Sequence, residues 1–193
     1  MMERQTLVAL LENRVGTLDR VTGVLRRRRF EVRSLSVGET VGTQLRRMTL
    51  TLVGDGADAR RAANHLAKLA DVVHVELLTD QPAVQRDLAM FKLAYGPTTL
   101  GVINALCEPF RGRVLDVSPE SVIVEVTGGP DKIDRFRDLL EPLGILEMVR
   151  SECVAMGRGA HRLGESAQGE SSQEAAVGKP EQTPKLIPNR STN

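Results

Sequence analysis

A short loop near the N-terminus holds the residues of this chain best suited to bind a small molecule. The apolar run that ends at Leu11 is interrupted by Glu12 and Asn13, and apolar residues then recur at helical spacing from Val15 onward. This pattern predicts a strand, a tight loop containing Gly16 and the start of a helix, where free backbone N–H groups point at one spot. Such a spot can hold a small carboxylate. An ordinary strand-to-helix connection with a capping polar residue has the same local pattern.

No other group of residues has the spacing of a catalytic or metal site. His65, His74 and His161 fall on a predicted helix, on a predicted strand and in the C-terminal segment, with no carboxylate or cysteine cluster nearby in sequence. Cys107 and Cys153 are far apart and outside any metal-binding spacing, so we expect two reduced, buried thiols. Nucleophile-elbow, phosphate-loop and metalloprotease motifs do not occur. We therefore expect no catalytic residue, no metal site and no enzymatic activity.

The first half of the chain predicts the element order βαββαβ. The hydrophobic periods place strands at 6–12, 30–37, 45–53 and 72–78, and helices at 16–29 and 57–69. The alternation slips once in the second strand, near Ser34. Right-handed crossovers then give a four-stranded sheet with both helices on one side, which is a ferredoxin-like arrangement.

The same order repeats after a polar, proline-containing link at 79–83. Strands are predicted at 87–93, 114–117, 121–126 and 145–156, and helices at 98–110 and 130–140. The expected fold class is therefore α+β, with two ferredoxin-like βαββαβ domains at residues 4–79 and 84–159. Residues 160–193 contain no aromatic residue and only scattered apolar ones. We expect a disordered C-terminal tail there.

Composition limits the possible classes of partner. The 193 residues carry a net charge of +1, so no overall field favours nucleic acid or a membrane surface. No apolar stretch approaches the roughly 18 residues of a membrane span, and the N-terminus does not look like a signal peptide, so we expect a cytoplasmic protein. The arginine run Arg26–Arg29 raises the alternative of an RNA-recognition module. Such modules stack bases on aromatic residues of their central strands, and the strands 6–12 and 45–53 contain none.

A series of short segments, spread in order over roughly residues 4–159, matches the pattern of one known family. The first segment is Leu10-Leu11-Glu12-Asn13-x-x-Gly16-x-Leu18-x-Arg20-Val21. The others include Ser34–Val37, Arg47–Leu50, Val53–Asp55, Leu66–Val72, Phe110–Val117, Gly144–Glu147 and Arg150-Ser151. Each segment is short, but the series as a whole resembles the small regulatory subunit of acetolactate (acetohydroxyacid) synthase, which carries an ACT domain. The second repeat would then be an ACT-like domain.

The resemblance implies a regulatory, non-catalytic role in branched-chain amino acid biosynthesis. Subunits of this family bind the large catalytic subunit, raise its activity and make it sensitive to feedback inhibition by valine or a related branched-chain amino acid. Thiamine diphosphate, Mg²⁺ and FAD are expected on that catalytic subunit, and no cofactor on this chain. ACT domains typically pair side by side as a homodimer, with the amino-acid effector at the interface. The family's effector position falls on Asn13, Arg14, Val15, Gly16, Thr17, Leu18, Glu31 and Val32.

The chain departs from the family pattern next to that position. Where the family usually has Arg-Gly-aromatic-Asn-Ile, this chain has Arg28-Arg29-Phe30-Glu31-Val32. The family's Asn helps to hold the effector across the dimer interface, whereas a carboxylate would repel the carboxylate of the effector. Arg29 in place of glycine also makes a positive φ costly. We expect that activation is kept and that valine binding is weakened or retuned, unless Glu31 points to solvent. A free-standing ACT-type amino-acid sensor with another target is the alternative function.

Overall fold

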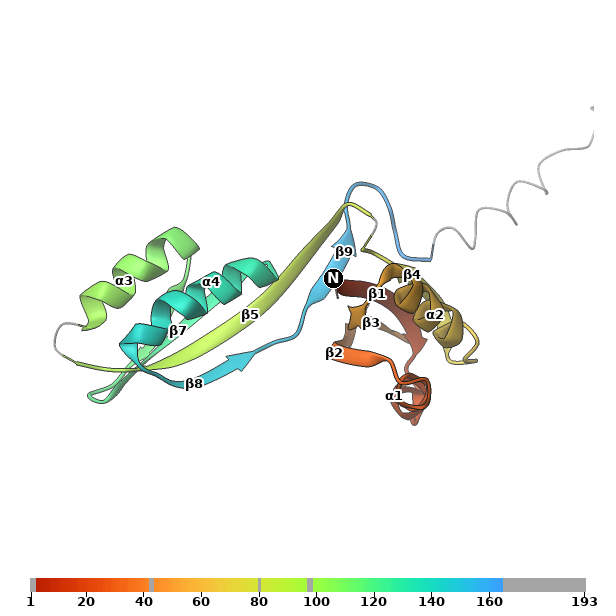
Figure 1. The fold of residues 1–193 in the computed structure, drawn as a ribbon, viewed down its shortest axis with the longest axis horizontal. Coiled ribbons are helices and arrows are strands. Elements are labelled where there is room, and N and C mark those ends of the chain that lie inside the picture. The colour runs from red at the N-terminus through yellow and green to blue at the C-terminus, as the bar shows by residue number, and fades with distance from the viewer. Residues whose placement is uncertain (1–2, 42–43, 80, 97–98, 165–193) are drawn as a thin grey trace, which may run out of the picture.

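The computed structural model describes residues 3–41, 44–79, 81–96 and 99–164, which form two α+β units (Figure 1). The first unit comprises β1 (Glu3–Glu12), α1 (Thr17–Arg27), β2 (Glu31–Glu39), β3 (Leu45–Gly54), α2 (Gly56–Leu66) and β4 (Val72–Leu77). The second comprises β5 (Ala83–Ala94), α3 (Thr99–Phe110), β6 (Arg113–Val117), β7 (Ser121–Gly128), α4 (Pro130–Leu140), the 3-10 helix η1 (Glu141–Leu143), β8 (Ile145–Arg150) and β9 (Val154–Gly157). The predicted α+β class with a repeated βαββαβ order is confirmed.

The first unit is a four-stranded antiparallel sheet in the order β2-β3-β1-β4. Alternate residues of the two central strands face α1 and α2 and form an aliphatic core. The strand and helix residues fully buried in this core include Leu7, Ala9, Leu11, Met48, Leu50, Leu52, Val21, Leu25, Ala59, Ala62 and Leu66. The slip predicted near Ser34 is confirmed, because the register of the edge strand β2 shifts between Val32 and Ser34.

The two helices of the first unit begin in different ways. α2 opens with a capping box, in which the Asp55 carboxylate accepts from the backbone N–H of Asp58 at 2.8 Å and the Asp58 carboxylate accepts from that of Asp55 at 3.4 Å. α1 has no side-chain cap, and Gly16 precedes it in the left-handed region with φ +84°. No side chain of the described residues therefore caps the first N–H groups of α1.

The long strand β5 belongs to two pairings. Residues Asp87–Ala94 pair with β7 in a sheet of order β6-β7-β5-β8, whereas Ala83–Arg86 pair with β9. Helices α3 and α4 cover one face of this sheet (Figure 1). The prediction of a single last strand over 145–156 was wrong. The Ser151 hydroxyl accepts a hydrogen bond from the N–H of Leu88 at 2.9 Å, in the place of a backbone carbonyl. The pairing of β5 with β8 therefore stops there, and pairing of β5 resumes with β9.

The C-terminal segment covers the face of the first sheet that lies opposite its helices. Cys153 and Ala155 pack with Val8 and Leu78 in a small apolar cluster. Residues 160–164 lie on the same face, where Leu163 packs against this cluster. The rest of the expected tail, 165–193, lies outside the described residues. The two units therefore share packed surface as well as the connecting chain.

Candidate functional site

The loop between β1 and α1 leaves several backbone donors unused. The amides already bonded are those of Asn13, Arg14 and Thr17, which donate to the carbonyls of Gln44, Glu12 and Arg14 at 2.9, 2.9 and 3.2 Å. Among the described residues, no acceptor faces the amides of Val15 and Gly16. The positive φ of Gly16 turns these groups outward ahead of the helix, where its dipole also favours an anion.

A cavity of about 150 Å³ lies beside this loop. Its apolar wall is formed by Leu11, Leu18 and Val37, and Thr17 and Asn13 contribute polar groups. The Thr17 hydroxyl is buried and has no hydrogen-bond partner among the described residues. Arg14 also lines the cavity, whereas the side chain of Val15 is fully exposed outside it. The cavity thus combines the unpartnered Thr17 hydroxyl and the carboxylate of Glu12 with a small aliphatic surface, and the unused amides of Val15 and Gly16 lie in the adjoining loop.

Glu31 and Val32 do not lie near this cavity in a single chain. Glu31 pairs with Val53 on β3, and Val53 pairs with Arg4 at the start of β1. The loop, in contrast, follows the end of β1, so the two groups lie at opposite ends of the sheet, about 25 Å apart. Both side chains are exposed on the edge strand. The predicted site is therefore brought together only in part.

Arg29 adopts a positive φ, which carries a steric cost for any residue with a side chain. Its φ is +57°, in the left-handed region that glycine occupies without a steric penalty. A residue with a side chain thus occupies here a conformation that favours glycine.

Arg20 anchors the loop and was not predicted to be functional. Its Nε forms a short ion pair with Asp71 Oδ2, and the Asp71 carbonyl accepts the N–H of Glu12 at 2.9 Å. A Cβ added at Gly16 would lie 3.0 Å from Arg20 Nη1, so the guanidinium covers the glycine. The sequence carried one signal, since Arg20 stands one helical turn after Gly16.

We expect the loop to loosen only in strong acid. The hydrogen bond from Arg20 holds the pKa of the Asp71 carboxyl below its ordinary value of 3.8. A carboxyl group whose pKa is lowered by folding stabilises the folded form at any pH above its ordinary pKa. This stabilisation is lost as the pH falls through the lowered pKa of the folded form. The backbone NMR signals of Gly16 and Arg20 should therefore move only below pH 3.8. Arg20→Gln should raise the midpoint toward that value, and equal midpoints in both proteins would contradict the assignment.

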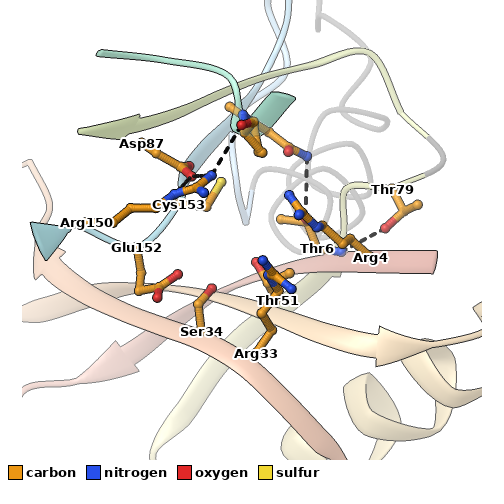
Figure 2. Close-up of a pocket in the computed structure, with 12 residues that line it drawn as sticks. Arg4, Thr6, Arg33, Ser34, Thr51, Thr79, Asp87, Arg150, Glu152 and Cys153 are labelled. Atoms are coloured by element: carbon orange, nitrogen blue, oxygen red, sulfur yellow. Dashed lines mark hydrogen bonds and ion pairs between the residues drawn. The ribbon is translucent and has the colours of Figure 1, made fainter. Parts of the chain in front are cut away.

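A more polar cavity, with a volume of about 140 Å³, lies between the two units, and Figure 2 shows the residues that line it. Arg150 is its central charge, with Nε 2.7 Å from Asp87 Oδ2 and Nη1 2.7 Å from Asp134 Oδ1. Arg4 of β1 reaches the same Asp134 at 3.4 Å. Asp87 is only 4% exposed. Because these charges are already paired, we interpret the network as a contact that joins β1 to β5, β8 and α4.

The two cysteine thiols are in environments that oppose nucleophilic chemistry. Burial raises the pKa of the Cys107 thiol, and burial together with the charge of Asp87 raises that of Cys153 to about 11. Both thiols are therefore protonated near neutral pH, and the thiolate is the reactive form. As expected, both cysteines are buried and unbridged. No cluster of three potential metal ligands is found in the described ranges, and no helix there is long and apolar enough to cross a bilayer.

Comparison with known proteins assigns both units to one family. Residues 86–159 match the family profile described as the small subunit of acetolactate synthase, and residues 7–74 match the one described as the AHAS small subunit-like ACT domain. The chain is 40% identical over 156 residues to the probable acetolactate synthase small subunit of Archaeoglobus fulgidus, a match that covers 81% of this chain and 98% of the relative. The chain belongs to the acetolactate synthase small subunit family.

Further relatives of the small subunit agree with this assignment. The acetolactate synthase small subunit of Bacillus subtilis is 36% identical over 164 residues, covering 84% of this chain and 95% of the relative. The crystal structure of the small subunit from Thermotoga maritima superposes with a TM-score of 0.75 at 29% identity, over 82% of this chain and 99% of that one. The resemblance recognised in the sequence is therefore confirmed over both units.

Proposed function

We propose that this chain activates the large, thiamine-diphosphate-dependent catalytic subunit of acetolactate synthase in the cytoplasm and makes it sensitive to a branched-chain amino acid. Membership in the small subunit family supports the regulatory role. The observation that carries the effector site is the loop with unused amides at Val15 and Gly16 beside an aliphatic cavity. Residues 4–79 form the effector-binding domain in this proposal and 84–159 the second domain. Mg²⁺, FAD and thiamine diphosphate would reside on the catalytic subunit.

A homodimer completes the proposed effector site. β2 is an edge strand whose outer side has no partner strand in the described residues. In an antiparallel, two-fold symmetric pairing of β2 with β2 of a second copy, the Glu39 end of one strand meets the Glu31 end of the other. The loop Asn13–Leu18 lies at the Glu39 end, because Glu39 pairs with Arg46 and Glu12 with Leu45. Glu31 and Val32 of the second copy would thus reach the cavity from which they are separated within one chain.

Glu31 is expected to weaken effector binding in this dimer. Its carboxylate would approach the amides that take the effector carboxylate, and two like charges repel strongly in a partly dry site. Calorimetric titration of valine into the full chain should therefore give an affinity weaker than micromolar. Glu31→Asn should tighten binding by about tenfold or more, since one removed charge repulsion of ~1.4 kcal/mol has that effect. Micromolar valine binding by the unaltered chain, with no gain from Glu31→Asn, would contradict this.

Acetolactate formation by the catalytic subunit tests the whole proposal. The rate is measured with and without this chain over a valine titration, and Glu31→Gln serves as a size-matched variant without the charge. We expect activation by every form and stronger inhibition by valine with Glu31→Gln than with the unaltered chain. Absence of both activation and co-purification with the catalytic subunit would favour the free-standing amino-acid sensor.

A further inference from the structure

A larger cavity lies on the opposite side of the first sheet from α1 and α2. It has a volume of about 410 Å³, is open to solvent on one side and lies between that sheet and the C-terminal segment. Its apolar wall includes Val8, Leu10, Leu45, Leu78, Met156 and Leu163. Arg47 Nη2 donates to the carbonyl of Ala155 at 2.7 Å and thereby holds β9 over the sheet. The volume falls within the range of small-molecule sites.

The carboxylate of Glu76 stands in the wall of this cavity with one oxygen incompletely bonded. Its side chain is 12% exposed, and both oxygens approach Nε2 of His161, at 2.8 and 2.9 Å. One imidazole nitrogen carries at most one proton, so it can donate a single well-directed hydrogen bond. Oε1 is left without a hydrogen-bond donor among the described residues. A positively charged group in the cavity would supply the missing donor and offset the burial of the carboxylate.

Arg47 provides the opposite charge across the sheet. It projects from β3 opposite Leu10, whereas Glu76 projects from β4 opposite Val8, so the two charged side chains flank β1. Beyond its bond to Ala155, the guanidinium has no other hydrogen bond among the described residues, although it carries five donors. Burial lowers the pKa of the half-buried Arg47, while the charge of Glu76 acts in the opposite direction. An anionic group beside it would accept from donors that have no acceptor among the described residues.

We propose that this cavity is a second binding site, for a small α-amino acid with an aliphatic side chain. The ammonium group donates to Glu76, the carboxylate accepts from Arg47, and the side chain packs on the apolar wall. This site is distinct from the loop Asn13–Leu18, whose cavity is lined by Leu11 and Val37 on the helix-covered face. Because the cavity lies between the first sheet and the C-terminal segment, the ligand would hold the two together.

Met156 offers a direct readout that does not involve the loop. Its side chain lines the cavity, whereas Met48 is fully buried in the core on the other face. The full chain is labelled with ¹³C at the methionine methyl groups, Met156→Leu assigns the signal, and L-leucine is titrated. We expect a saturable shift of the Met156 methyl signal and an unchanged Met48 signal. The matched probes are 4-methylpentanoate, which lacks the ammonium group, and 3-methylbutylamine, which lacks the carboxylate; both should shift Met156 far less.

Variants then assign the charges and separate the two sites. Glu76→Gln keeps the shape and a hydrogen bond to His161 and should weaken leucine binding by about tenfold or more, because a charge-assisted bond is lost. Glu147→Gln, on an exposed position of β8, is the matched control and should leave the titration unchanged. Gly16→Val should also leave it unchanged, even where it removes binding at the loop. No saturable Met156 shift, or an equal shift in the Glu76→Gln protein, would overturn the proposal.

Discussion

Arg150→Met is expected to lower the free energy of unfolding by about 3–5 kcal/mol. The Arg150 side chain is 17% exposed and that of Asp87 4%, so the pair is largely shielded from water. The substitution keeps most of the aliphatic volume but leaves the Asp87 carboxylate buried without its cation. It also removes the bond to Asp134 that links β8 to α4. Urea unfolding of the two proteins measures the difference.

Two further variants show whether the loss comes from the unpaired charge. Arg137→Met removes an ion pair with Asp138. The side chain of Arg137 is 46% exposed and that of Asp138 60%, so this substitution should change the free energy of unfolding little. In the double variant Asp87→Asn/Arg150→Met no buried charge is left alone, so part of the lost stability should return. A loss for Arg150→Met as small as that for Arg137→Met would contradict a shielded pair.

Gly16→Val is expected to remove feedback inhibition while activation of the catalytic subunit remains. A β-branched residue is strongly disfavoured at the φ of +84° found here, with a cost of about 1–2 kcal/mol, and its Cβ would meet Arg20 Nη1 at 3.0 Å. The loop must therefore change its backbone conformation, and the amides of Val15 and residue 16 should no longer point at the proposed position of the effector carboxylate. The valine concentration for half-inhibition should rise by about tenfold or more, because charge-assisted hydrogen bonds are lost.

The acetolactate assay with the catalytic subunit measures both effects of this substitution. Gly101→Ala is the matched control, since a Cβ there meets nothing within 4 Å and no positive φ is required. It should leave both inhibition and activation unchanged. If Gly16→Val retained the valine response of the unaltered chain, the loop would not hold the effector.

Local patterns were sufficient to predict most of the fold. The helix Pro130–Leu140 has its predicted bounds, because Pro130 stands at its first position and its buried apolar residues all lie on one face of the helix. The β-bulge at Ser34 was visible as a slip in alternation. The predicted strand 145–156 joined β8 and β9, because the pairing of β9 with the start of β5 joins residues about seventy positions apart and no local period indicates such a partner.

In the candidate site, too, groupings of sequence neighbours could be predicted, whereas contacts between distant residues could not. Asn13 to Leu18 are neighbours in sequence, so their grouping could be predicted from the strand-to-helix pattern. The Arg20–Asp71, Arg150–Asp87 and His161–Glu76 contacts join residues 51, 63 and 85 positions apart. Charged residues at those positions are also typical of solvated surfaces, so only the fold identifies their partners.

The continuous strand β5 has a mechanical consequence for communication between the two units. Its 12 residues span about 40 Å, and along this length the strand is paired first with β9 and then with β7 and β8. A strand that is hydrogen-bonded to neighbouring strands resists bending and twisting far more than a free peptide does. We therefore expect that a rotation of the first unit near Ala83 would tilt the second sheet, because β5 is hydrogen-bonded along its length. A flexible linker would not pass such a rotation on to the second sheet.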